Sequence, residues 1–158
     1  MGLFRTPKIK RMRDGSYAVA LESWERDLLR TLPGQLRDLL STDDPALERL
    51  YPPAYVDDDE RNDEYQRLMR GDLERRRTSS LDVMEATIDA TSLEEEQLVA
   101  WMGAVNDLRL VLGTRLDVSE DPLEDQVDED DPRAPALALY GYLGHLQETV
   151  VAALSSAL

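Results

Sequence analysis

Side chains able to do covalent chemistry are few in this sequence. His145 is the single histidine among 158 residues, and the chain has no cysteine. A lone histidine without a cysteine or an elbow-type serine lacks the partners that nucleophilic catalysis needs. The absence of cysteine also excludes disulfides and thiolate metal sites. We therefore expect a protein that is not an enzyme and that uses no cofactor.

Two acidic runs are the remaining candidates for a metal site. They span residues 57–60 and 128–131. Carboxylates suit hard divalent cations, but both runs lack the alternating ligands and central glycine of a calcium loop. We expect solvated charge with no metal ligands, and a carboxylate metal-dependent enzyme is only the third functional hypothesis.

Basic charge is concentrated at the N-terminus. Residues 1–13 contain no acid and five bases, which are Arg5, Lys8, Lys10, Arg11 and Arg13. The formal net charge of the whole chain is -15, which leaves -20 for the remainder once the +5 of this segment is removed. Such an arm could contact nucleic acid or an acidic partner. The alternative is a solvated edge strand, where lysine and arginine prevent unwanted strand pairing.

A polar stripe adjoins the most regular apolar stripe of the chain. Asn106, Arg109 and Gly113 lie at i, i+3 and i+7, so they share one face of the helix expected there. Glycine inside a helix costs about 1 kcal/mol relative to alanine and usually permits a close approach. The stripe predicts an anchor for another helix or for a second subunit. The alternative is a satisfied polar network within one chain.

The elements that must position these residues follow from the spacing of apolar side chains. Asp14-Gly15 predicts a β-hairpin over residues 8–21 with a two-residue loop. Apolar residues three or four apart predict helices over roughly 22–41, 45–50, 60–90, 93–116 and 136–156. We expect Trp24 and Leu28 on the apolar face of the first helix and a break at Pro33. We also expect Ser92 to begin a helix in a capping box with Glu95.

Composition places these elements in one acidic domain over residues 1–158. Hydrophobic residues make up 42% of the chain, enough for one core. Residues 117–135 are rich in Asp, Glu and Pro and predict a loop. No apolar run approaches the ~20 residues of a membrane span, and no signal peptide is visible, so we expect a cytoplasmic protein. The predicted fold class is mainly α: a helical bundle of about five helices with an N-terminal β-hairpin.

Five stretches resemble an actinobacterial family of unknown function that is often encoded beside the ClpS adaptor. They are LRTLPGQLRDLL at 29–40, LYPPAY at 50–55, EYQRLMRGD at 64–72, WMGAVNDLRLVLGTRLDV at 101–118, and residues 139–154. The residues that carry the match, or that could form an interface, are Tyr55, Tyr65, Asn106, Asp107, Arg109, Gly113, Thr114 and Arg115.

This resemblance implies a mostly helical cytoplasmic protein. The family includes oxidative-stress transcriptional regulators of the AosR type, so it also implies a regulatory role. It supplies no catalytic residues. The sensing members use a cysteine pair, and a chain without cysteine cannot use that switch. Methionine oxidation is a weak substitute.

The leading hypothesis is a non-enzymatic regulatory or interaction protein that acts through protein–protein contacts as a homodimer. The alternative is a DNA-binding transcriptional regulator that uses the basic N-terminal hairpin. Neither hypothesis involves a membrane.

Overall fold

The computed structural model describes residues 7–50, 58–116 and 130–156, and it confirms the predicted mainly α fold. Arg5, Tyr55 and the stretch 117–129 of the predicted acidic loop lie outside these residues. The predicted loop also ends too late in the chain, because Ala134 and Pro135 already belong to the last helix. Proline is tolerated there because the first helical turn has no partner for its missing N–H group.

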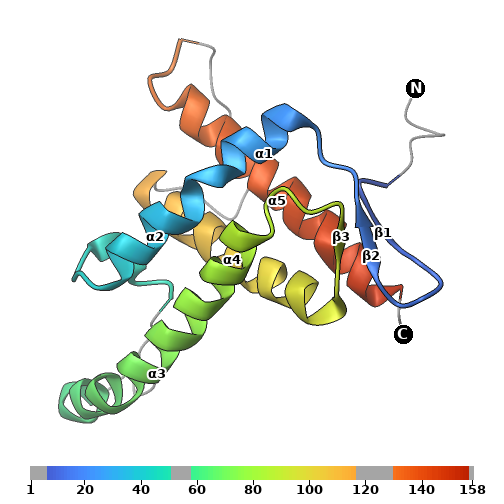
Figure 1. Cartoon of the computed structure of the whole chain (residues 1–158). Coiled ribbons are helices and arrows are strands. Elements are labelled where there is room, and N and C mark those ends of the chain that lie inside the picture. The colour runs from blue at the N-terminus through green and yellow to red at the C-terminus, as the bar shows by residue number, and fades with distance from the viewer. Residues whose placement is uncertain (1–6, 51–57, 117–129, 157–158) are drawn as a thin grey trace.

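A small sheet lies at one end of the molecule, beside the last turns of α5 (Ala134–Ser155), as Figure 1 shows. Strand β1 (Ile9–Arg11) pairs antiparallel with β2 (Tyr17–Val19), which pairs with β3 (Ser92–Leu93). The strand order β1-β2-β3 leaves β1 on an outer edge. The predicted hairpin is present, and its sheet has one strand more than the sequence indicated.

The hairpin loop has three residues instead of the two expected from Asp14-Gly15. The N–H group of Met12 donates to the carbonyl of Ser16 at 2.7 Å, so this pair closes the loop. Gly15 has a φ of 89°, in the left-handed region that glycine adopts without strain. A left-handed glycine after a tight turn is typical of three-residue hairpins with a bulge.

The first predicted helix is divided into α1 (Ser23–Arg30) and α2 (Leu32–Leu40). The break falls at Thr31, because Pro33 has no N–H group and its ring would clash with the carbonyl one turn earlier. The buried face was assigned wrongly on α1: Trp24 and Leu28 are exposed, and Glu25 and Leu29 are buried. The predicted helix over 45–50 is a single 3₁₀ turn, η2 (Pro45–Leu47), capped by Asp44.

Three long helices make up the rest of the described chain. Helix α3 (Asp59–Ala86) packs by its C-terminal half against α4 (Glu95–Leu116), and its first half extends away from the body (Figure 1). The predicted helix over 60–90 ends earlier in the structure: α3 ends at Ala86, and Thr87 is its C-cap. The Thr87 hydroxyl donates to the Val83 carbonyl at 2.6 Å. Ser92 lies in β3 and does not cap α4. Instead the Glu94 N–H group donates to Gln97 Oε1 at 2.8 Å.

The core lies between α4, α5, the C-terminal half of α3 and the inner face of the sheet. Trp101, Val105 and Leu98 of α4 are fully buried, as the apolar spacing predicted. Leu143, Leu146 and Val150 face them from α5. Among the described residues, no helix combines the length and the apolar character that a membrane span requires.

Candidate functional site

The polar stripe of α4 faces α5 within the same chain. Asn106 Oδ1 accepts a hydrogen bond from Gln147 Nε2 at 3.2 Å. The Arg109 guanidinium lies over the ring of Tyr140, 5.1 Å from its centre. A Cβ atom at Gly113 would lie 2.9 Å from Tyr140 Cε2, so this glycine lets the two helices approach closely. The contacts support the alternative of a network within one chain.

Asp107, next to this stripe, is a buried carboxylate with one cationic partner. Its side chain receives a hydrogen bond from Arg77 at 2.5 Å, and Arg77 also donates to the Leu50 carbonyl at 2.8 Å. Burial raises the pKa of Asp107, and the Arg77 charge opposes the rise. The pair therefore joins α3, α4 and the segment after η2, and it has a structural role.

The other family-signature residues are spread over the described chain. The Thr114 hydroxyl donates to the Leu110 carbonyl at 2.9 Å within α4. Arg115 forms an ion pair of 3.5 Å with Asp44, and Tyr65 lies in the first half of α3. The structure does not bring these residues together into one site.

A second buried carboxylate, Glu25, was not found from the sequence. It is 1% exposed and joins three elements. Lys8 Nζ donates to its Oε2 at 2.6 Å, the Glu22 N–H group donates to the same oxygen at 2.8 Å, and the Tyr142 hydroxyl donates to Oε1 at 3.1 Å. Burial alone would raise the pKa of Glu25, but these donors together lower it.

The surroundings of Glu25 are aromatic. The rings of Trp24 and Tyr142 lie 5.8 Å apart, and Lys8 Nζ lies 5.8 Å from the centre of the Trp24 ring. Burial, followed by the Glu25 charge, raises the pKa of Tyr142. A glutamate three residues after Glu22 is a capping-box signal that could have indicated the local contact, but not the contacts with Lys8 and Tyr142.

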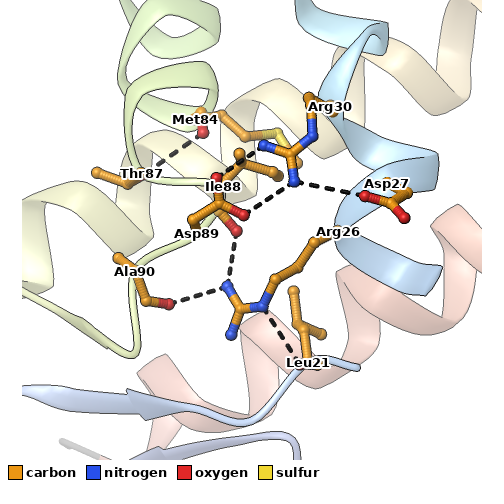
Figure 2. Close-up of polar contacts among 9 residues, drawn as sticks. All are labelled: Leu21, Arg26, Asp27, Arg30, Met84, Thr87, Ile88, Asp89 and Ala90. Carbon is orange, nitrogen blue, oxygen red and sulfur yellow. Dashed lines mark hydrogen bonds and ion pairs between the residues drawn. The ribbon is translucent and has the colours of Figure 1, made fainter. Parts of the chain in front are cut away.

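Two arginines of α1 hold the turn that follows α3, as Figure 2 shows. Arg26 donates to the carbonyls of Ile88 at 2.7 Å and Ala90 at 3.0 Å. Arg30 forms an ion pair of 2.7 Å with Asp89. Arg26 thus satisfies two backbone carbonyls of a partly buried turn, and Arg30 adds an ion pair, so this cluster fixes the turn against α1.

The predicted basic arm divides into two parts. Lys8 is held by Glu25, whereas Lys10, Arg11 and Arg13 are exposed and have no ion pair to any described acid. An open groove runs between β1 and the last turns of α5. It is lined by Ile9, Lys10 and Arg11 on one side and by His145, Thr149 and Ala152 on the other. We call this surface the β1–α5 groove.

The lining of the groove includes His145. His145 is exposed, and the groove places no carboxylate beside it. Across the described ranges, no three His, Asp or Glu side chains are arranged to hold a metal ion. What the groove offers is a basic rim, a mixed apolar and hydroxyl wall, and a strand edge.

A family model for a domain of unknown function, DUF2017, matches residues 2–154. The chain belongs to this family. The DUF2017 match covers the basic hairpin, the α4 stripe and the helices that pack around them.

A curated relative of this DUF2017 chain comes from Mycobacterium leprae (strain TN), and its provisional name is oxidative stress regulator AosR. The two proteins are 31% identical over 129 residues. The match spans 71% of this chain and 59% of the relative, so the chain covers less than two thirds of that protein's length. No solved structure matches the chain.

Proposed function

We propose that this chain is a cytoplasmic regulatory protein that acts by binding a protein partner, without catalysis and without a thiol switch. The name of the Mycobacterium leprae relative supports the regulatory class. Because the sequence contains no cysteine, regulation by this chain cannot use thiol oxidation. Glu25 and Asp107, the two buried carboxylates among the described residues, are both held by partners inside the fold, which favours structural roles for them.

The observation that carries the proposal is the β1–α5 groove. It places exposed cations and an outer strand edge beside the end of a helix. An acidic body with a basic groove presents a localised field that selects and orients an oppositely charged partner. The α4 stripe, the other candidate interface, already contacts α5: Gly113 is buried, and Asn106 and Arg109 are half-buried.

Site-specific crosslinking in the native cytoplasm tests this proposal. A photoreactive amino acid replaces Ala152, which lines the groove, and in a matched control it replaces Val99, which is 46% exposed on α4. We expect a discrete protein adduct from position 152 that is absent from position 99 and is lost when Lys10 and Arg11 are changed to Glu. The same adducts from both positions, or no protein adduct from position 152, would contradict the proposal.

DNA binding is the second candidate, and the exposed side chains of Lys10, Arg11 and Arg13 favour it. Changing Lys8, Lys10 and Arg11 to Ala should then weaken DNA binding and flatten its dependence on salt. Lys8 should contribute least, because Glu25 already neutralises it. A gel-shift experiment at low salt decides this point, since no retardation of any duplex would exclude the DNA function.

We also propose that the homodimer forms through the first half of α3 instead of the α4 stripe. Leu68 is 70% exposed on this helix. Residues 59–66 carry a formal charge of -3 and residues 67–76 carry +2. Two copies packed antiparallel about Leu68 would set each acidic half against a basic half, which gives a self-complementary interface.

Light scattering over a range of concentrations tests the dimer. Leu68→Glu should yield a monomer, and Val99→Glu, an exposed change on another helix, should leave the mass unchanged. A wild-type protein that stays strictly monomeric at high concentration would contradict the proposal.

A further inference from the structure

We propose that the open edge of β1 accepts an extended acidic segment of a partner protein as a fourth strand, seated in the β1–α5 groove. This inference rests on the proposed function, because it names the chemistry of the partner segment. Strand addition of this kind draws affinity from main-chain hydrogen bonds and specificity from alternate side chains.

The pairing register shows which backbone groups are open. Lys8 accepts from the Ala20 N–H group at 2.7 Å, and Met12 donates to the Ser16 carbonyl at 2.7 Å. Lys10 lies opposite Ala18 between these two bonded pairs, so the backbone groups of residues 8, 10 and 12 face β2. The N–H and C=O groups of Ile9 and Arg11 must therefore point away from β2. Arg11 is exposed at this edge, whereas Ile9 is 2% exposed, so the accessible edge lies at Arg11. The described chain supplies no other strand on that side.

Charge decides which occupant this edge can take. A second copy of the chain paired edge to edge would bring Lys10 and Arg11 close to their own equivalents. Such like charges disfavour the contact, and edge lysines are a common defence against self-pairing. An acidic segment meets the opposite situation, since exposed Lys10, Arg11 and Arg13 have no described ion-pair partners.

The groove also fits the alternation of a strand. Ile9 and Ala153 are buried at its floor, and Ala152 and Thr149 line the α5 wall. Lys10 projects from the opposite face of the sheet to Ile9, because successive side chains of a strand alternate. A segment with alternating carboxylate and apolar side chains would place its apolar set toward the α5 wall and its carboxylates beside Lys10. Nucleic acid would satisfy the cations but would leave the strand edge unpaired.

The test uses the full chain and an acetylated octapeptide of alternating glutamate and valine. Two variants separate charge from backbone pairing. Arg11→Ala removes the charge and keeps the N–H group, whereas Arg11→Pro removes both. Proline is compatible with an edge strand where its missing N–H group faces outward. Met12→Pro shows the effect of a proline whose N–H group is needed inside the hairpin: the Met12 N–H group donates to Ser16, so its loss should disrupt the hairpin.

We expect Arg11→Ala to weaken peptide binding only slightly, because Arg11 shares the face of Ile9 and does not lie beside the carboxylates. Arg11→Pro should weaken binding by a further ~5-fold, about the value of one hydrogen bond. A lysine–valine octapeptide should not bind. Equal binding by Arg11→Ala and Arg11→Pro would overturn strand addition, as would short duplex DNA binding more tightly than the acidic peptide. Should Arg11→Pro fail to fold, amide exchange in the wild-type protein decides, because the peptide must slow exchange at Arg11.

The failure of this inference can be told apart from failure of the proposed function. If position 152 captures the same protein in Arg11→Ala and Arg11→Pro, partner binding stands and strand addition is wrong. If position 152 captures no protein while the acidic peptide still binds in the expected order, the edge chemistry stands and the proposed function is wrong.

Discussion

Two regions that the sequence predicts as interfaces differ in how far the fold leaves them accessible. The polar stripe of α4 packs against α5, and its members contact Gln147 and Tyr140 of the same chain. The basic strand β1 keeps Lys10 and Arg11 exposed on an outer edge. The comparison teaches that spacing identifies residues sharing a face, but only the packing shows whether that face is already occupied. Changes in the α4 region should therefore affect stability, and changes on the β1 edge should affect binding.

The largest effect is expected at Asp107. Asp107→Ala removes the buried partner of Arg77 and should lower the free energy of unfolding by about 3–5 kcal/mol, the usual cost of breaking a buried ion pair. Urea denaturation measures the loss. Asp107→Asn, which keeps an acceptor, should cost less. A loss below about 1 kcal/mol for Asp107→Ala would show that the pair is not part of the core.

Gly113 tests how closely α4 and α5 approach. Gly113→Ala would bring a Cβ atom within 2.9 Å of Tyr140 Cε2, and overpacking of this kind costs about 1–3 kcal/mol. Gly141→Ala is the matched control, because a Cβ atom there meets no other atom within 4 Å. Since alanine is the better helix former, the control should gain up to ~1 kcal/mol. Thermal unfolding that ranks both variants alike would break the comparison.

Glu25 gives a dependence on pH. Its pKa is lowered in the folded state, so its contribution to stability is present above the ordinary value of 4.5 and is lost as the pH falls through the folded value. Glu25→Gln should therefore destabilise most at neutral pH, by about 1.5–3 kcal/mol for hydrogen bonds to a charged group. The difference from wild type should shrink in acid.

Asp107→Asn provides the contrasting profile for that experiment. The pKa of Asp107 is raised in the folded state, so the wild type loses its contribution as the pH rises through the folded value. The Asn variant should become more stable relative to wild type over that range. Parallel pH profiles for Glu25→Gln and Asp107→Asn would contradict the assigned directions.

The smallest stability effect is expected on the β1 edge. Lys10→Ala and Arg11→Ala remove exposed side chains without described partners and should change the free energy of unfolding by less than about 0.5 kcal/mol. The same variants should reduce crosslinking from position 152. A large stability loss without any binding defect would show that β1 stabilises the fold and does not bind a partner.

The long helices could be predicted from the sequence because their apolar residues repeat over many turns, as Leu98, Trp101 and Val105 show. Strand β3 could not, because two residues carry no periodicity. The buried face of α1 was misassigned because Glu25, a charged residue, takes an inward position. Its partners Lys8 and Tyr142 lie 17 and 117 residues away in the chain, so no local pattern could reveal them. The basic arm was visible, but its division by Glu25 was not.

Amide hydrogen exchange along β1 tests the central claim most directly. In the free protein, Lys10 and Met12 should exchange slowly because their N–H groups face β2, whereas the exposed Arg11, which faces away from β2, should exchange fast. Adding the acidic octapeptide should slow Arg11 and leave Lys10 and Met12 unchanged. Slow exchange at Arg11 in the free protein would show that the edge is already covered, and no change on adding the peptide would show that it does not accept a strand.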